Sequence, residues 1–270
     1  MTQTTAFPFD RLAVTETPPA APVTPAVAIE PVVVKPGYMK PIFATLGVHL
    51  GTAVVAAIVL LIPAIVFFGE KAENLSVGAT FGIALVQQIL TLAFLPILAR
   101  INGTSLTELL ALKRPQGGRR ANRLIVIFAL ILMLVGGLVA LAVLNYPQGS
   151  NSPVGSAASI AGLKGLAWWS AIAAIVLAAP IGEELLFRGY LVSRLSASKL
   201  GTTGAIWISS LLFALAHLNY PLLGMAFIGG LGAALALVRI RSGSIWPSIS
   251  LHILWNSFIV LMSLGLASGA

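Results

Sequence analysis

A run without a single charged residue extends from Leu200 to Val238, and it constrains the fold more than any other feature of the sequence. As one helix, at 1.5 Å per residue, this run would be about twice as long as the ~30 Å hydrocarbon core of a membrane. Two helices must therefore share it. The sequence Asn219-Tyr220-Pro221 supplies the break, because asparagine and proline favour turns. It predicts one helix near 204–218 and another near 221–239.

Apolar segments long enough to span a membrane recur along the rest of the chain. Only 9% of the 270 residues are charged and 58% are hydrophobic, whereas about a quarter of the residues in a soluble domain are charged. So few charges cannot cover the surface of a soluble globule, and lipid must be the solvent for most of it. We therefore predict an all-α fold, a polytopic membrane helix bundle of about seven transmembrane helices. The other helices are expected near 41–68, 78–99, 124–144, 166–191 and 244–266.

The chain divides into three predicted parts. Residues 1–37 are rich in proline, alanine and threonine, a composition that cannot bury enough apolar surface to fold, so we expect a disordered tail. Residues 38–164 contain three accessory transmembrane helices and a basic loop, in which Ser105 followed by Glu108 predicts a capping box and a short surface helix. Residues 165–270 contain the last four helices.

Basic residues are distributed unevenly between alternate loops. Thirteen of the 16 lie in residues 1–40 and in the loops 100–123, 193–203 and 239–244, two lie in the other loops, and Arg188 lies inside a helix. Because Lys and Arg mark cytoplasmic loops, the count predicts a multi-pass protein of the cell or inner membrane with a cytoplasmic amino terminus. The net charge of +8 then reflects topology, and we expect the lipid bilayer, not nucleic acid, as a partner.

Two adjacent acids lie inside a predicted span. Glu183 and Glu184 are the only ones of the eight acidic residues in such a position, and an ionisable residue there costs about 2.5–3.5 kcal/mol on insertion scales. Arg188 follows Glu184 by four residues on one helix face, so we expect these two to pair. Glu183 is then left without a local cation. The alternative is that both carboxylates only hold helices together.

Two of the three histidines have few polar neighbours along their own helices. His49 has only Thr45 and Thr52 at helical spacing, and we interpret it as a residue of helix packing. His217 follows Phe213 by four residues, on one face of its helix. Taken alone, His217 also favours a structural role.

The last predicted helix carries a polar pair. His252 and Asn256 are one turn apart, and each is costly in lipid unless it faces a polar interior. At 1.5 Å per residue from the helix ends, these two residues fall at about the same depth as Glu183 and His217. We therefore expect the four side chains to converge on one site.

The residue inventory excludes most routes to peptide hydrolysis. The chain has no cysteine, and its only aspartate is Asp10 in the tail. Catalysis by a cysteine thiolate and catalysis by a pair of aspartates are therefore excluded. No H-E-x-x-H zinc motif and no G-x-S-x-G elbow occurs, although a Ser–His dyad stays formally open. What remains is a water molecule activated by a glutamate.

In this scheme Glu183 takes a proton from a water that His217 also holds, and the water attacks the scissile carbonyl. His252 and Asn256 then donate hydrogen bonds to the oxyanion. Arg188 orients Glu184, and no cofactor is required.

A zinc site made of Glu183, His217 and His252 is an alternative, but we prefer a site without metal. A zinc-bound histidine usually bonds a carboxylate through its other ring nitrogen, and Glu184 is already matched to Arg188. Asn256 would also have no role as a ligand in such a zinc site.

Three motifs carry a family resemblance: Glu183-Glu184-x-x-x-Arg188, Phe213-x-x-x-His217 and His252-x-x-x-Asn256. In this order and in apolar helices, they resemble the motifs of the CAAX-protease and bacteriocin-processing (CPBP, or Abi) family of intramembrane glutamic endopeptidases. The resemblance covers about 165–262 and, more weakly, 106–115. It implies that 165–270 is a four-helix catalytic core, with catalytic residues Glu183, His217, His252 and Asn256 and supporting residues Glu184, Arg188 and Phe213.

The resemblance also implies a reaction and its alternatives. We expect an intramembrane endopeptidase that acts on membrane-associated peptides or lipidated proteins, CAAX-like or other, without a metal. A non-catalytic regulator or immunity protein of the same fold is the alternative in another class. A transporter is disfavoured, because no internal repeat is evident.

Overall fold

The structure of the chain, a computed structural model, describes residues 37–68, 76–116, 159–218 and 220–268, together with Ile127, Ile131, Leu134, Val135, Gly136 and Leu138. These residues all lie in one unit of the chain, 35–270. Within this described part the secondary structure is helical and contains no strand, so the predicted all-α class is confirmed. The tail predicted at 1–37 lies, apart from Gly37, outside the described residues.

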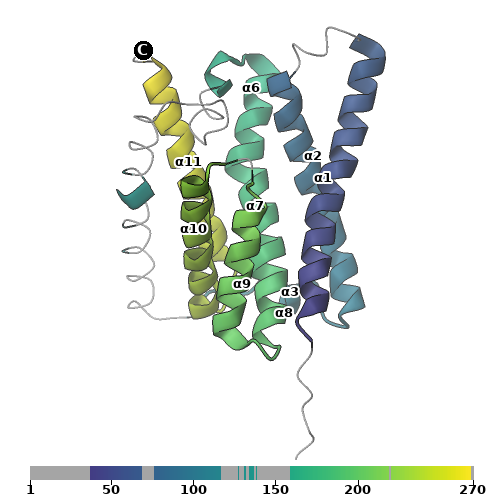
Figure 1. Cartoon of the computed structure of the whole chain (residues 1–270), viewed down its shortest axis with the longest axis vertical. Coiled ribbons are helices and arrows are strands. Elements are labelled where there is room, and N and C mark those ends of the chain that lie inside the picture. Colours follow the sequence, from purple (N-terminus) through teal and green to yellow (C-terminus); the bar gives the residue numbers. More distant parts are fainter. Residues whose placement is uncertain are drawn as a thin grey trace, which may run out of the picture. The chain divides into compact units, whose positions relative to one another are not determined.

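Two long helices begin the described part. α1 (Met39–Phe68) and α2 (Ser76–Ile101) confirm the helices predicted at 41–68 and 78–99. They pack side by side, as Figure 1 shows. Their buried contact includes two threonine hydroxyls, since Thr52 Oγ1 lies 3.2 Å from Thr91 Oγ1.

The predicted capping box follows α2. Ser105 is the N-cap of the short helix α3 (Leu106–Leu109), and its hydroxyl accepts a hydrogen bond from the Glu108 N–H at 3.2 Å. The Glu108 carboxylate in turn accepts hydrogen bonds from the hydroxyls of Ser105 and Thr104. Leu110, directly after α3, is buried against Gly189. The predicted N-cap and surface helix are therefore confirmed, although Glu108 bonds the two hydroxyls and not the backbone N–H of Ser105. This segment is fixed against the helix that carries the acidic pair.

One long span, Gly165–Ser196, corresponds to the helix predicted at 166–191. It follows a short 3-10 helix, η2 (Ser159–Gly162). Two π-helical segments interrupt it, and such segments shift the backbone hydrogen bonds and are frequent at functional sites. In chain order its parts are α6 (Gly165–Ile172), η3 (Ala173–Ala178), α7 (Ala179–Glu183), η4 (Glu184–Leu191) and α8 (Val192–Ser196).

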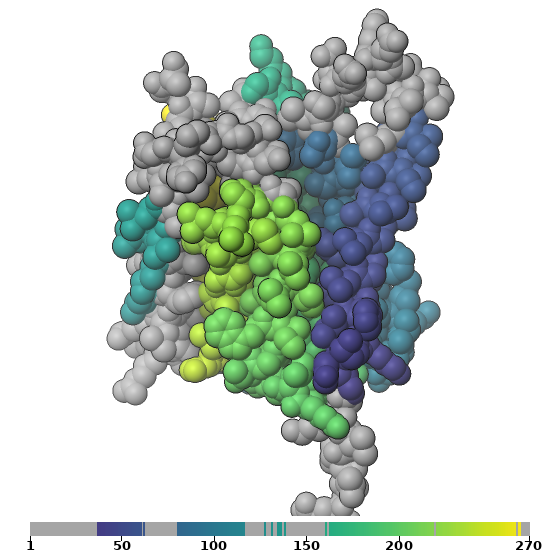
Figure 2. Space-filling model, in the orientation of Figure 1, coloured from purple at the N-terminus to yellow at the C-terminus, as the bar shows by residue number. Residues whose placement is uncertain are grey.

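Three further helices complete the described part: α9 (Gly201–Leu215), α10 (Leu222–Ser242) and α11 (Trp246–Ser268). α10 packs against both α9 and α11, and α9 and α10 form the green face in Figure 2. The break predicted at Asn219-Tyr220-Pro221 is confirmed, because α9 ends before it and α10 begins directly after Pro221. α10 ends at Gly243, whose φ of 63° is a conformation that glycine adopts without strain.

Four of the described helices are long and apolar enough to cross a membrane, and two more are shorter apolar helices. The predicted polytopic membrane helix bundle is thereby confirmed. The span predicted at 124–144 lies mostly outside the described residues. Within it, a Cβ added to Gly136 would overlap the Trp255 indole, so this position lies directly against α11.

Candidate functional site

Glu184 and Arg188 form the predicted pair. Arg188 Nη1 lies 3.0 Å from Glu184 Oε1, and both side chains are completely buried. The Arg188 guanidinium also lies over the Phe213 ring, 4.0 Å from its centroid, in a cation–π contact. Gly232 on α10 provides the space, because a Cβ there would lie 2.9 Å from Arg188 Nη2 and 3.2 Å from Phe213 Cδ1. Three helical segments therefore meet at one buried cation.

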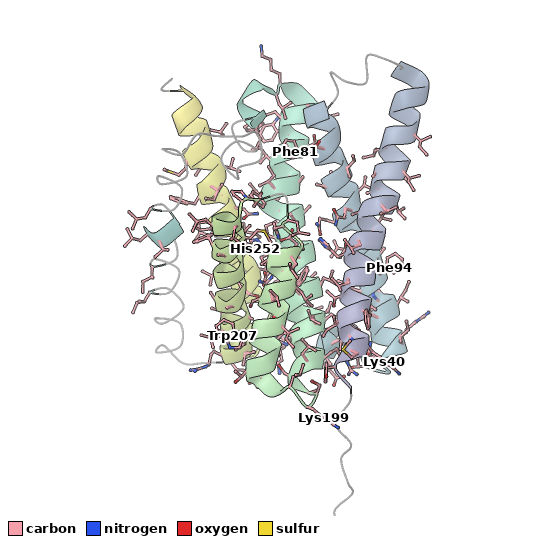
Figure 3. All side chains as sticks on the ribbon, viewed as in Figure 1. Lys40, Phe81, Phe94, Lys199, Trp207 and His252 are labelled. Carbon is pink, nitrogen blue, oxygen red and sulfur yellow. The ribbon has the colours of Figure 1, made fainter. Side chains whose placement is uncertain are left out.

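His252 lies between the two glutamates. Its Nδ1 is 3.0 Å from Glu184 Oε1, and its Nε2 is 3.9 Å from Glu183 Oε2. Since the Glu184 carboxylate is already paired with Arg188, it acts as an acceptor, and His252 Nδ1–H donates to it. Figure 3 shows His252 at mid-height in the bundle, whereas Lys40 and Lys199 lie at one end.

The two glutamates differ in exposure. The Glu184 side chain is fully buried, whereas 12% of the Glu183 side chain is exposed. Glu184 is therefore held by an ion pair with Arg188 and a hydrogen bond from His252, while Glu183 faces the less enclosed side of the cluster. This geometry agrees with the prediction that Glu184 is paired with Arg188 and that Glu183 has no cation on its own helix.

Asn256 lies one turn beyond His252 and bonds to the backbone of another helix. Its Nδ2 donates to the Ile175 carbonyl at 2.8 Å. In the π register of η3 the Ala179 N–H bonds to the Ala174 carbonyl, and the next such bond would join residue 180 to Ile175. Residue 180 is proline, which has no N–H. Asn256 therefore supplies the hydrogen bond that Pro180 cannot give. Among the described residues, the second amide hydrogen of Asn256 has no acceptor.

His217 follows the end of α9, and its ring is held by the backbone one turn earlier. His217 Nδ1 lies 2.8 Å from the Phe213 carbonyl. A carbonyl oxygen only accepts, so Nδ1 carries the hydrogen, and Nε2 of the neutral ring has a free lone pair. The ring packs edge-on against Phe213 and stacks with Tyr220.

Two phenylalanines connect all three histidines. Phe213 contacts the rings of His217 and His252, with centroid distances of 4.8 and 6.0 Å. Phe187 contacts Phe213 at 5.3 Å and His49 at 5.8 Å. The aromatic pair thus separates the imidazoles while keeping them in one region.

His49 and Gln88 are the neighbours of this cluster that the sequence analysis did not assign to it. His49, on α1, is within electrostatic range of both Glu183 and His217, although it also packs on Phe187 as predicted. Gln88, on α2, is buried, and a Cβ on Gly182 would overlap its amide. The only feature of the sequence that could have indicated their place in the cluster is that each is a polar residue inside an apolar span.

Of the four residues expected to converge, Glu183 and His252 lie closest together, with His252 Nε2 3.9 Å from Glu183 Oε2. His217 joins them through Phe213, and within the described part of the chain it forms no hydrogen bond or ion pair with Glu183. Asn256 reaches the cluster from the side of η3. Among the residues described, no group of three His, Asp or Glu side chains is arranged to hold a metal ion.

One argument made from the sequence is wrong. Glu184 was expected to be unavailable to a histidine because it pairs with Arg188, yet its Oε1 lies 3.0 Å from both Arg188 Nη1 and His252 Nδ1. A carboxylate in an ion pair can still accept a hydrogen bond from another donor. The carboxylate–histidine pair that often supports a metal ligand is therefore present, and Glu184 gives no reason to prefer a site without metal.

The comparisons with known proteins agree with the motifs. Residues 165–258 match the family model described as type II CAAX prenyl endopeptidase, Rce1-like. Neither the curated proteins nor the solved structures gave a match to the chain. The family match confirms the resemblance to the CPBP family over the segment that holds every predicted site residue, and at the level of that family it supports a peptidase.

Proposed function

We propose that this membrane protein is an endopeptidase that cleaves peptide bonds of membrane-associated substrates, lipidated proteins with a C-terminal C-a-a-X sequence included. The observation that carries the proposal is His252, which bonds buried Glu184 on one side and faces the more exposed Glu183 on the other. Together with the family match over 165–258, this geometry supports hydrolysis by water that a glutamate activates.

Glu183 and His217 would activate the water. The His217 Nε2 lone pair accepts a hydrogen bond from the water, because Nδ1–H is already committed to the Phe213 carbonyl. The Glu183 carboxylate removes a proton as the water oxygen attacks the scissile carbonyl carbon. When the C–N bond breaks, Glu183 returns the proton to the leaving nitrogen, so the side chains end as they began.

His252 would stabilise the oxyanion through its Nε2–H. Because Nδ1–H donates to Glu184, the ring offers a second N–H only as an imidazolium. With that imidazolium, the two carboxylates and the Arg188 guanidinium, the formal charges of the cluster would sum to zero. Glu184 is then a positioning residue that sets the orientation of His252.

Asn256 would be the second oxyanion donor. One of its two amide hydrogens is used by the Ile175 carbonyl, which holds the carboxamide in a fixed orientation. The other is free to meet the developing negative charge. Fixed donors are effective there because they do not reorganise during the reaction.

The test is Glu183→Gln in purified full-length protein, assayed with a farnesylated C-a-a-X peptide. The substitution keeps the shape but removes the base, so turnover should fall by about 10²–10⁴-fold while the protein stays inserted and thermally stable. Glu73→Gln, the same change in the sequence between α1 and α2, is the control and should keep full turnover. Retention of more than about a tenth of wild-type turnover in Glu183→Gln would refute the base assignment.

A second experiment addresses the natural substrate. Cells with wild-type protein and cells with Glu183→Ala are compared by mass spectrometry of membrane-protein termini. Termini that disappear in the variant identify the substrates. Identical termini, together with no cleavage of the farnesylated peptide, would favour the non-catalytic regulator instead.

We also propose that the reaction needs no metal. Protein freed of metal by prolonged chelation should keep full turnover, because a glutamate, two histidines and an asparagine supply the required groups. Loss of activity on chelation, recovery with stoichiometric zinc and about one zinc per chain by elemental analysis would make the protein a metalloprotease.

The orientation proposed for the chain places the amino terminus and the loops 100–123, 193–203 and 239–244 in the cytoplasm. Lys40 and Lys199, from two of these basic segments, lie at the same end of the bundle in Figure 3. Single-cysteine labelling is clean because the chain has no cysteine. A cysteine at Gly117 should label only after permeabilisation, and one at Ser152 should label in intact cells. The reverse pattern would invert the topology.

A further inference from the structure

A pocket separate from the histidine and glutamate cluster lies where α3, α8 and the end of α10 meet. Its volume is about 480 Å³, within the range of small-molecule sites. It is lined by three cations and three hydroxyl side chains, among other residues: Lys113, Arg194, Arg239, Thr104, Thr107 and Ser193. None of the predicted catalytic or supporting residues lines it. Its function is therefore not explained by the proposed hydrolysis.

One side of the pocket is fixed in place by hydrogen bonds. The segment after α3 is hydrogen-bonded to the α10–α11 turn at three points: Ser244 Oγ donates to the Lys113 carbonyl at 2.6 Å, the Gln116 N–H to the Ser242 carbonyl at 2.7 Å, and the Ile245 N–H to the Ala111 carbonyl at 3.2 Å. Ala111 lines the pocket and has a φ of 50°, which is unusual for a residue with a Cβ. Such conformations persist only where the surrounding contacts enforce them.

The charges in this pocket are not balanced by the protein. Glu108 is the one acid among the lining residues, and its carboxylate accepts hydrogen bonds from Thr104 and Ser105 at the α3 N-cap. Three cations against one acid leave a formal charge of +2. Within the described residues, no carboxylate lies within 4.0 Å of Lys113, Arg194 or Arg239.

Of the three lining cations in the described part of the chain, Arg239 is the one with a buried N–H that has no partner. Its Nη2 donates to the neutral Ser193 hydroxyl at 3.0 Å. Its Nε is buried and, within the described part of the chain, has no hydrogen-bond partner. A guanidinium with an unpaired Nε–H, beside two further cations, suits the several anionic oxygens of a phosphate better than a single carbonyl.

The location indicates where such a phosphate would come from. α8 and α10 end here, and α3 is a short helix outside the spans. The ends of transmembrane helices lie at the membrane surface, at the level of the lipid phosphates. Basic pockets between transmembrane helices at that level bind anionic headgroups.

We propose that this pocket binds a phosphate group, presented by an anionic membrane lipid and held by Arg239, Arg194 and Lys113. The binding does not depend on the hydrolysis proposed above, because the two sites share no residue. A soluble phosphate ester offers the same chemistry, and a peptide C-terminal carboxylate would be a different ligand.

The test is native mass spectrometry of the full-length protein, titrated with dioleoyl phosphatidic acid and, for comparison, with dioleoyl phosphatidylcholine. Phosphatidic acid should bind one to one and more tightly than phosphatidylcholine. Arg239→Gln should weaken its binding about tenfold or more, since a charge-assisted hydrogen bond is lost.

The chain provides a matched control for each variant. Arg241→Gln removes a cation from the same last turn of α10, but Arg241 is exposed and does not line the pocket. It should keep wild-type binding. If Arg239→Gln does not fold, Lys113→Gln replaces it, and about a fivefold loss is expected from the loss of one cation. Its control is Arg114→Gln, because Arg114 is the next residue but does not line the pocket.

Further arms of the titration identify the source of the phosphate. Glycerol 3-phosphate should displace the lipid only at much higher concentration, because it lacks the acyl chains. Displacement at equal concentration would keep the phosphate site but make its ligand a soluble ester. Equal loss of lipid in Arg239→Gln and Arg241→Gln, no loss in either, or displacement by a peptide acid but not by its amide would each overturn the proposal.

Discussion

The accessory helices α1 and α2 and the core segment 165–268 both bury polar side chains between apolar helices, but they do so with different chemistry. In α1 and α2 the buried polar groups are neutral. Thr52 pairs with Thr91, Thr45 bonds the Pro41 carbonyl, and the half-buried Gln87 donates to the His49 carbonyl. The core segment buries several serines as well, but of these two described regions it alone also buries charged side chains: Glu184 forms an ion pair with Arg188 and accepts a hydrogen bond from His252.

This difference determines how much each region depends on a single arrangement. A threonine hydroxyl that loses its partner can turn back to a carbonyl of its own helix, as Thr52 already does with Val48 at 2.7 Å. A carboxylate or guanidinium in an apolar interior has no such local substitute, and its burial is tolerated only while it is paired. We therefore expect the core segment to respond strongly to single substitutions, and the accessory helices weakly.

Arg188→Met should cause the largest loss of stability. It removes the cation from fully buried Glu184 and leaves an uncompensated charge, a change that typically costs about 3–5 kcal/mol. The double variant Glu184→Leu with Arg188→Met removes both charges and should recover most of that loss. It should nevertheless stay inactive, because His252 has lost the carboxylate that orients it. Denaturation midpoints and peptide turnover, measured on both variants, separate the two effects.

If the Arg188→Met variant has the same denaturation midpoint as the wild type, the buried charges do not make the core segment more sensitive to substitution than the accessory helices. Recovery of turnover in the double variant would instead contradict the positioning role of Glu184.

Asn256→Ala should have the next largest effect, on turnover above all. Loss of an oxyanion donor typically lowers kcat by about 10²–10³-fold with little change in KM. The substitution also leaves the Ile175 carbonyl without its donor, so some stability should be lost as well. Adding Pro180→Ala restores an N–H at the position from which the π register would bond Ile175. Stability should then recover while turnover stays low.

Turnover that recovers together with stability in that double variant would show that Asn256 acts only through the backbone. His252→Ala serves as the comparison within the same helix. It removes the other proposed donor, and its loss of turnover should not be recovered by Pro180→Ala.

Most of the fold was predictable because its signals are local. The apolar runs and the turn residues at 219–221 predicted the described helices to within a few residues, and Ser105 with Glu108 predicted α3. The Glu184–Arg188 pair was also predictable, since helical spacing alone brings residues four apart together. These features depend only on residues close in sequence.

The cross-helix bonds of the site were not predictable in the same way. That His252 bonds Glu184, 68 positions away, depends on how α11 packs against the helix of Glu184, and hydropathy does not encode that rotation. The Asn256 bond to Ile175 depends on the π register of η3. Pro180 within an apolar span was a visible signal for that irregularity, because proline lacks the N–H that a regular helix needs. His49 was interpreted only from its own helix, and its proximity to Glu183 comes from α1 packing on η4.

The smallest effect is expected in the accessory helices, for Thr91→Val. The Thr91 hydroxyl lies 3.2 Å from that of Thr52, and inter-helix hydrogen bonds of this kind in membrane proteins contribute about 0.6 kcal/mol on average. Thr52 keeps its bond to the Val48 carbonyl, so no buried donor is left unpaired, and turnover should not change. Thr45→Val is the control, because that hydroxyl is buried but bonds only within its own helix. A double-mutant cycle with Thr52→Val measures the coupling free energy of the two threonines. A value as large as that of a buried ion pair would contradict the expectation that the accessory helices respond weakly to single substitutions.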